Sequence, residues 1–241
     1  MARLIKDRFQ TVVRSDGVSH FLIPKPVCLY CSKPIKKDFA VTRSCYDCSM
    51  ESENDGRELE RVISTAMYFP DFDPPGYPHN GEILAMKKGT TYSQQYSEVA
   101  AELVRNANLR LDPKALVMPV PPRIGEFESR GLVYFAGSLS KQLNIKGVRG
   151  LIFSSSSLPQ KQLSEPERRT NVAGKMTCQI DVRGMTTILV DDVLTTGNTM
   201  KEAARCLRNA GAWRIIGVTA ARTVHLSHLV YLGLAEGDSN P

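Results

Sequence analysis

The chain has 241 residues, of which 42% are hydrophobic and 23% are charged, a composition that is ordinary for a soluble globular protein. This length allows one substantial α/β domain with a small appendage. The net charge of +6 suits a phosphate-rich small ligand and permits nucleic acid without requiring it. No apolar run approaches the roughly 20 residues that span a bilayer. Residues 1–8 also lack the apolar core of a signal peptide, so we expect a cytoplasmic protein with no membrane segment.

The first 55 residues (1–55) are predicted to form a hairpin followed by a zinc ribbon. Apolar and polar residues alternate in residues 1–27 around Ser15-Asp16-Gly17, which favours two antiparallel strands. Two Cys-x2-Cys pairs then follow: Cys28, Cys31, Cys45 and Cys48. In a reducing cytosol such pairs are typical of a structural zinc ion, whose four thiolates leave no coordination position open. Two disulfides or a redox pair are the alternatives, although a redox Cys-x2-Cys usually begins a helix in a βαβ unit.

Residues 56–115 are predicted to form a linker and a hood-like helical segment. The polar, acidic stretch 51–56 is typical of a linker. Residues 70–81 are rich in proline and glycine, which indicates a loop. Apolar side chains recur at helical spacing in residues 92–106, which predicts an amphipathic helix.

Residues 116–224 are predicted to form the main α/β domain, and residues 225–241 a C-terminal tail. In chain order we expect a strand at 115–118, a helix at 132–143, strands at 151–153 and 188–190, a helix from residue 199 and a strand at 213–220. Gly211 is expected just after the end of the second of these helices. Because strands alternate with helices, the pattern predicts an α/β fold in which helices cover the faces of a parallel sheet.

The most informative motif begins at the end of the strand 188–190. Two adjacent carboxylates, Asp191 and Asp192, follow that strand, where open α/β sheets place their ligands. A loop of threonine, glycine and asparagine comes next, and a helix begins near Thr199, so backbone N–H groups can surround an anion. An ordinary strand-to-helix turn is the alternative, but adjacent carboxylates repel each other and give such a turn no stability. We therefore expect a phosphate in the loop and sugar hydroxyls on the carboxylates.

This motif resembles the 5-phosphoribosyl-1-pyrophosphate (PRPP) binding motif of type I phosphoribosyltransferases. The resemblance implies the doubly wound parallel sheet of that family. It also implies that Asp191 and Asp192 are the catalytic carboxylates, which hold the ribose hydroxyls near a Mg²⁺ ion. The residues implied to bind the 5-phosphate are Leu194, Thr195, Thr196, Gly197, Asn198 and Thr199.

A further resemblance, to the ComF/GntX subgroup of these proteins, covers residues 25–224. Two cysteine pairs precede the domain, and Met118-Pro119-Val120-Pro121 is followed by Arg130-Gly131 with the spacing of that subgroup. The pyrophosphate loop implied by the resemblance consists of Pro121, Pro122, Arg123 and Arg130. Glu126 and Glu128 stand where the subgroup usually has lysine or arginine, and their charge repels a pyrophosphate.

The segment 160–174 matches the mobile-loop signature of the same subgroup. Its polar character favours a lid that closes over a charged ligand and excludes water. The lid residues implied by the resemblance are Gln162, Ser164, Glu167, Arg168 and Asn171. The alternative is a solvated loop in which Ser164-Glu165-Pro166-Glu167 begins a helix.

Three functions are compatible with these motifs. The first is an enzyme that uses PRPP and Mg²⁺ to transfer the 5-phosphoribosyl group to a nitrogen acceptor, which the sequence does not identify. The second is a catalytically weak factor of the competence and DNA-uptake type that binds single-stranded DNA, as the resemblance to ComF proteins implies. The third is a regulator that binds PRPP without turnover, which Glu126 and Glu128 favour.

Overall fold

The computed structural model describes residues 3–4, 9–13, 20–24, 26–36, 43–49, 58–75, 77–154 and 174–236. The predicted linker at 51–56 lies outside these residues. So do all the predicted lid residues, namely Gln162, Ser164, Glu167, Arg168 and Asn171. None of the described helices is long and apolar enough to cross a membrane.

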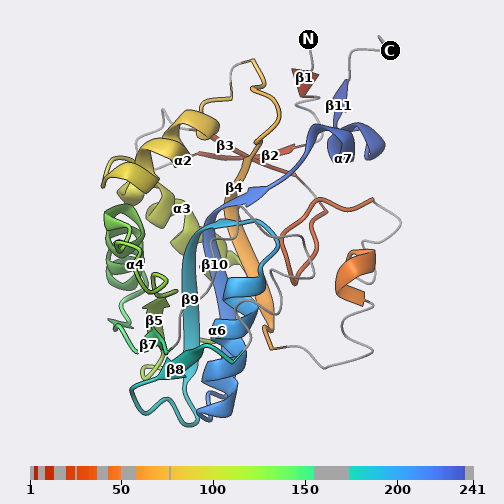
Figure 1. Cartoon of the computed structure of the whole chain (residues 1–241). Helices are drawn as coiled ribbons and strands as arrows, with labels where there is room; N and C mark the ends of the chain where they lie inside the picture. The colour runs from red at the N-terminus through yellow and green to blue at the C-terminus, as the bar shows by residue number, and fades with distance from the viewer. Residues whose placement is uncertain are drawn as a thin grey trace.

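A five-stranded sheet forms the centre of the molecule (Figure 1). In spatial order its strands are β4 (Arg61–Tyr68), β10 (Arg214–Thr223), β9 (Thr186–Leu194), β5 (Leu116–Pro119) and β6 (Lys146–Gly147). Every neighbouring pair runs parallel. The predicted α/β fold with a parallel sheet is therefore confirmed.

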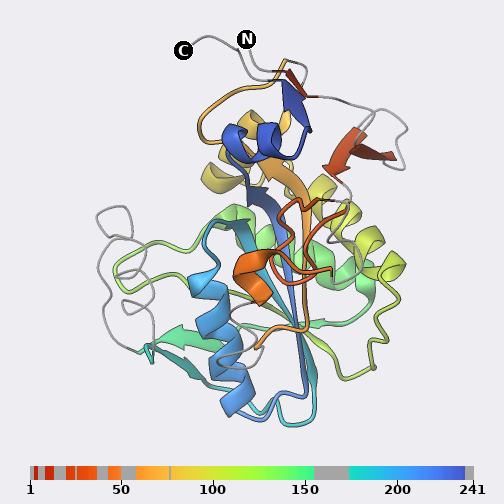
Figure 2. The ribbon, with the colours of Figure 1, turned by 90° about the vertical axis from the view of Figure 1, so that its right-hand side faces the viewer.

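Helices cover both faces of this sheet. The helices α2 (His79–Lys88), α3 (Ser93–Asn106) and α4 (Arg130–Leu143) lie on one face, and α6 (Asn198–Asn209) lies on the other (Figures 1 and 2). Alternate residues of β9 enter the two cores: Ile188 and Val190 belong to the cluster with α3 and α4, whereas Leu189 belongs to the cluster with α6. The α6 residues buried in that cluster are spaced as a helix requires: Met200, Ala203, Ala204 and Leu207.

The connections that leave the two central strands run in opposite directions. β5 continues through α4 to β6 at one edge of the sheet, whereas β9 continues through α6 to β10 on the other side. Because the two helices use opposite faces, a crevice is expected between the carboxyl ends of β5 and β9. This is the position at which open α/β sheets bind ligands.

Several predicted elements are confirmed with small changes. The helices expected at 92–106, at 132–143 and from residue 199 are α3, α4 and α6, and the strands expected at 115–118 and 213–220 are β5 and β10. Gly211 follows the end of α6 with a left-handed φ of 91°, as predicted. β9 is longer than the strand expected at 188–190, because β10 offers partners along its whole length, as far as Arg222 opposite Leu194.

Other elements differ from the predictions. Residues 56–115 contain an unpredicted strand, β4, whose six central residues are all buried, so no alternation of polar and apolar residues marks it. The loop expected at 70–81 ends early because α2 begins at His79. The strand expected at 151–153 is present as β7 (Leu151–Phe153), but it pairs antiparallel with β8 (Met176–Cys178) outside the main sheet.

The two ends of the described chain also contain regular structure. β2 (Phe9–Val13) and β3 (His20–Pro24) form the predicted antiparallel hairpin. Within the predicted tail, α7 (Leu226–Tyr231) buries Leu229 in an apolar cluster. β11 (Ala235–Glu236) pairs antiparallel with β1 (Arg3–Leu4), so the first and last described elements meet (Figure 2).

The segment that carries the four clustered cysteines, described at residues 26–36 and 43–49 and called the cysteine segment below, covers part of the free edge of β4 (Figures 1 and 2). Val62 N–H donates a hydrogen bond to Leu29 O at 2.7 Å. The hydroxyl of Ser32, a buried residue, donates to Val62 O at 2.8 Å and accepts from Ser64 N–H at 3.1 Å. These bonds satisfy edge groups that a neighbouring strand would otherwise satisfy, so the cysteine segment completes this part of the sheet.

Replacing Ser32 by alanine is expected to destabilise the protein by about 1–3 kcal/mol, because Val62 O and Ser64 N–H both lose a buried partner. For a chain of this size, that loss lowers the melting temperature by roughly 3–10 °C, as calorimetry would measure. Ser154→Ala is the matched control, because its exposed hydroxyl makes a hydrogen bond to Lys175 O at the surface. Equal melting temperatures for the two variants would contradict the role assigned to Ser32.

Candidate functional site

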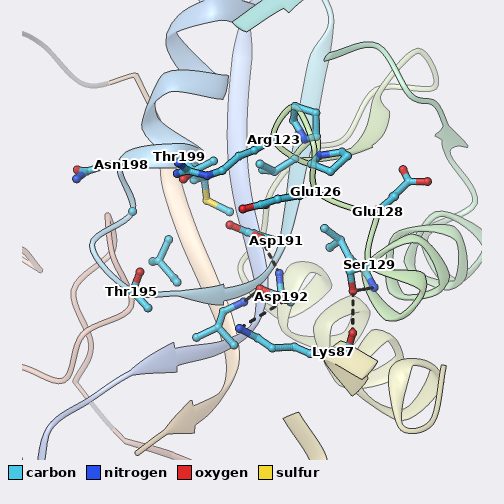
Figure 3. Close-up of a pocket in the computed structure, with 18 of the residues that line it drawn as sticks. Lys87, Arg123, Glu126, Glu128, Ser129, Asp191, Asp192, Thr195, Asn198 and Thr199 are labelled. Atoms are coloured by element: carbon cyan, nitrogen blue, oxygen red, sulfur yellow. Dashed lines mark hydrogen bonds and ion pairs between the residues drawn. The ribbon is translucent and has the colours of Figure 1, made fainter. Parts of the chain in front are cut away.

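A cleft of about 520 Å³ lies at the carboxyl ends of β5 and β9 (Figure 3). This volume is within the range of small-molecule sites. The cleft is formed by the loop after β5, the beginning of α4, the end of β9 and the first residues of α6. The structure brings into it all the residues predicted from the PRPP motif: Asp191, Asp192, Leu194, Thr195, Thr196, Gly197, Asn198 and Thr199.

The loop after β9, called the phosphate loop below, comprises residues 194–199 and has a backbone suited to an anion. Gly197 has a left-handed φ of 81°, which turns the chain from the strand into α6. The capping position before α6 is Gly197, which has no side chain to offer to the first turn of the helix. The first N–H groups of a helix have no partner in the preceding turn, and the helix dipole favours a negative charge beside them.

Asp191 and Asp192 are partly buried side by side at the end of β9. Asp192 N–H donates to Asp191 Oδ1 at 2.9 Å, and Val193 N–H donates to Asp192 Oδ1 at 2.6 Å. Burial, and then the charge of Asp192, raises the pKa of Asp191 to about 7. The pair therefore carries excess negative charge, which a cation or hydroxyl donors would stabilise.

Lys87 lines the cleft, although it was not among the residues predicted from the sequence. It lies in the last turn of α2, and its Nζ is 3.7 Å from Asp192 Oδ2 (Figure 3). Its carbonyl accepts a long hydrogen bond of 3.5 Å from Ser129 Oγ at the start of α4. Basic residues are common in a last helical turn because they complement the helix dipole, so the pair Lys87-Lys88 is only a weak sequence signal for a site.

Replacing Lys87 by methionine is expected to move the pKa of Asp191 further upward, because the charge of the lysine lowers it in the intact protein. Carbon-detected NMR of the aspartate carboxyl groups would measure the titration midpoint. Lys88→Met removes the neighbouring charge, which does not line the cleft, and should leave the midpoint unchanged. An equal midpoint in both variants would show that Lys87 does not act on the acidic pair.

The predicted pyrophosphate loop lies opposite the phosphate loop. Pro121, Pro122 and Arg123 line the cleft, but Arg130 is exposed at the first position of α4 and does not. Arg123 is partly buried, which lowers the pKa of its guanidinium. Its side chain extends toward the first turn of α6 (Figure 3), so it adds positive charge between the two loops.

Two acidic residues share this wall. Glu126 and Glu128 line the cleft, as their positions in the loop suggested. Glu128 Oε2 lies 3.1 Å from Arg149 Nη2, and this ion pair offsets part of its charge. Phe127 between them is fully exposed. The loop therefore repels a pyrophosphate less strongly than the sequence alone indicates.

The four predicted metal ligands form one cluster. The ligand atoms of Cys28, Cys31, Cys45 and Cys48 all lie within 4.8 Å of one another, and all four cysteines are free. The sulfurs of Cys31 and Cys45 are 3.8 Å apart, which matches the edge of a tetrahedron with metal–sulfur bonds of about 2.3 Å. The thiol of Cys31, followed by those of Cys45 and Cys48, holds the pKa of Cys28 well below its usual range. The cluster is thus compatible with a tetrahedral zinc site, and the alternative of disulfides is not observed.

Comparisons with known proteins match part of this site to a known domain. The family model described as "Phosphoribosyl transferase domain" matches residues 129–227, which include α4, the acidic pair and the phosphate loop. Ribose-phosphate pyrophosphokinase of Methanopyrus kandleri is 59% identical over 34 residues, 14% of this chain and 12% of that protein. The same enzyme of Prochlorococcus marinus is 50% identical over 46 residues, 19% of this chain and 14% of that protein. The chain therefore matches only a small part of the length of these curated relatives.

Two of the solved structures that align with this chain have low overall similarity to it. Glutamine PRPP amidotransferase from B. subtilis is 20% identical, with a TM-score of 0.37, and the alignment covers 54% of this chain and 27% of that one. A hypoxanthine phosphoribosyltransferase from Staphylococcus aureus is 12% identical, with a TM-score of 0.38, and the alignment covers 56% of this chain and 73% of that one. Residues 129–227 therefore match a phosphoribosyl transferase domain, and this segment supplies Ser129, Leu132 and residues 191–200 of the cleft, whereas Lys87 and the loop after β5 precede it.

Proposed function

We propose that this protein binds PRPP with Mg²⁺ in the cleft and transfers the 5-phosphoribosyl group to a nitrogen acceptor. The observation that carries the proposal is the order of groups along β9 and α6. Two carboxylates come first, then a loop that ends in Gly197, then the start of a helix, all within the matched segment. A sugar phosphate offers the complementary groups in the same order, namely hydroxyls and then a doubly charged phosphate.

Each part of the cleft has a role in this proposal. The N–H groups of residues 195–199 bind the 5-phosphate, and Asp191 and Asp192 accept hydrogen bonds from the ribose hydroxyls. Lys87 and Arg123 supply positive charge near the departing pyrophosphate. The nitrogen of the acceptor forms a bond to C1, the C1–O bond breaks, and pyrophosphate leaves with the bonding electrons while the acceptor releases a proton to solvent. The protein contributes position and charge and needs no covalent nucleophile.

The acidic pair has the donor set that Mg²⁺ prefers, because carboxylate oxygens are hard ligands. Burial, and then the charge of Asp192, raises the pKa of Asp191 to about 7, and a bound cation would offset both effects. Asp191 and Asp192 would hold the ion together with the ribose, and Lys87 would remain beside Asp192. When bound, Mg²⁺ would offset charge that develops on the pyrophosphate.

The four-cysteine cluster supports two further parts of the proposal. A structural zinc ion held by Cys28, Cys31, Cys45 and Cys48 would fix the segment that completes the edge of β4. The order of cysteine pairs, proline loop and PRPP motif supports membership of the ComF/GntX subgroup.

The test is isothermal titration with PRPP and Mg²⁺, followed by analysis of the same mixture for pyrophosphate and ribosylated product with a panel of amines and nucleobases. We expect binding that needs both PRPP and Mg²⁺, with pyrophosphate release that depends on the acceptor. Asp191→Asn should lose both signals, and Ser154→Ala, at the surface, should keep them. A wild-type protein that is folded and binds no PRPP in the presence of Mg²⁺ would refute the proposal.

The two alternatives give different results in the same experiment. A regulator would bind PRPP with Mg²⁺ and release no pyrophosphate with any acceptor. A factor of the competence type would bind single-stranded DNA with an affinity that falls steeply with salt, because phosphate contacts release counterions. DNA affinity without PRPP affinity would favour this last function over the transferase.

A further inference from the structure

Arg222 lies beside the phosphate loop but outside the PRPP motif. It is near the carboxyl end of β10, directly opposite Leu194 at the end of β9. Its Nη1 donates to Leu194 O at 2.8 Å and also to Thr195 O. These two carbonyls belong to the first peptide groups of the phosphate loop, so a single guanidinium nitrogen binds the point at which the loop leaves the sheet.

The planarity of the peptide bond gives these contacts a consequence for the ligand. In a trans peptide the C=O of one residue and the N–H of the next point in opposite directions. When Leu194 O and Thr195 O face Arg222, the N–H groups of Thr195 and Thr196 must face away from it. Both residues line the cleft. Among the described residues, neither of these N–H groups donates to another backbone group, so both are available to an anion.

The electrostatics of Arg222 support a role beyond packing. No described acidic residue forms an ion pair with Arg222, and its buried Nε has no hydrogen-bond partner among the described residues. Arg214 at the other end of β10 differs, because its guanidinium binds both carboxylate oxygens of Glu60 as well as Arg110 O. The charge of Arg214 is therefore neutralised, whereas that of Arg222 remains next to the loop and polarises the two peptide groups it contacts.

We propose that Arg222 is a positioning residue that holds two carbonyls of the phosphate loop outward, so that the N–H groups of Thr195 and Thr196 face the 5-phosphate before it arrives. The inference rests on the proposed function, because it assumes that the loop binds the phosphate of PRPP. It adds a residue from a different strand to that site. Preset N–H groups need no reorganisation on binding, and this is the source of the affinity that Arg222 contributes.

The experiment measures the affinity of the full chain for two probes, ribose 5-phosphate and Mg²⁺-pyrophosphate, by isothermal titration. Arg222→Met should weaken ribose 5-phosphate binding by about 10- to 100-fold, the loss expected for misplaced charge-assisted hydrogen bonds. Its affinity for Mg²⁺-pyrophosphate should stay within about twofold, since that probe does not use residues 195 and 196. Arg222→Lys should recover part of the loss through its charge, and added guanidinium should restore part of the affinity of Arg222→Ala.

Arg214→Met is the matched control on the same strand, because it removes an arginine that binds carbonyl and carboxylate groups away from the cleft. It should lower the melting temperature without changing either affinity. The inference is overturned if a folded Arg222→Met binds ribose 5-phosphate as well as the wild type does. It is also overturned if both probes are weakened equally, because the residue would then support the whole domain. If the wild type binds neither PRPP nor ribose 5-phosphate, the proposed function itself fails, which is a distinct result.

Discussion

If the four-cysteine cluster holds zinc as proposed, replacing Cys31 by serine is expected to abolish zinc binding and to lower the melting temperature by about 10 °C, the largest loss of stability predicted for a single substitution in this protein. Structural zinc sites contribute directly to the free energy of folding. For a chain of this size, a loss of roughly 3–5 kcal/mol in the free energy of unfolding corresponds to the expected shift in melting temperature. Zinc content by mass spectrometry and calorimetry of the same sample would measure both effects.

The loss should extend beyond the cysteine segment because that segment contacts the domain at several points. Ser32 binds the backbone of β4. His228 Nε2 of α7 donates to Pro34 O at 2.8 Å, and Lys36 Nζ lies 4.0 Å from the centre of the Tyr231 ring. Without the metal, the cysteine segment that makes all these contacts loses its fixed conformation. The free edge of β4 then becomes available to other chains. We therefore expect Cys31→Ser to aggregate more readily than the wild type.

Cys178→Ser is the matched control for this experiment. Cys178 is a free, partly buried cysteine in β8 whose Sγ contacts Ile180 O, and it is not part of the cluster. It should keep one equivalent of zinc and most of the stability. A wild-type protein that takes up no zinc when Zn²⁺ is supplied, and that then melts at the same temperature as Cys31→Ser, would disprove the metal site.

The affinity for PRPP with Mg²⁺ is expected to fall about tenfold for each pH unit below 7, the second of the two largest effects. The pKa of Asp191 is about 7 in the free protein, and the proposed binding of the ribose hydroxyls uses its carboxylate form. Binding below pH 7 must therefore release a proton from Asp191, which costs about 1.4 kcal/mol per pH unit. Titration calorimetry between pH 5.5 and 8.5 would measure the dependence.

Asp192→Asn separates this effect from the titration of the ligand. The charge of Asp192 raises the pKa of Asp191, so its removal should move the decline in affinity to lower pH. The phosphates of PRPP titrate identically in both experiments, and the difference between the two profiles therefore belongs to Asp191. Superimposable profiles, with the variant only weaker overall, would mean that the Asp191 pKa is not raised by its neighbour.

The same pKa has a consequence for stability. The pKa of Asp191 is higher in the folded protein than the roughly 3.9 of an unfolded chain, so the folded state binds more protons between these values. The stabilisation from this group is complete at low pH and is lost as the pH rises through about 7. Asp191→Asn should therefore be more stable than the wild type at pH 8, by about 1–2 kcal/mol after screening in the cleft, although the proposed binding of PRPP should be lost.

The sequence by itself determined the parts of this protein that depend on short-range patterns. The apolar spacing of α3, α4 and α6 fixes one buried face on each helix, and α6 has the expected glycine, Gly211, after its end. The run from Asp191 to Thr199 forms a continuous strand end, loop and helix start, so its chemistry is visible in its order alone. The spacing of the two cysteine pairs likewise predicts their meeting.

Only the tertiary structure decided which distant segments meet. β4 joins the main sheet, and β7 does not, because pairing depends on which strand edge is free and not on local propensity. Lys87 reaches Asp192, and Arg222 reaches the phosphate loop, across more than two dozen residues of intervening chain. Sequence patterns record the faces that a segment buries, but the partners of a helix end or a strand end are fixed by the packing of the whole chain. For this reason the motif was predicted from the sequence, and the residues that charge and orient it were not.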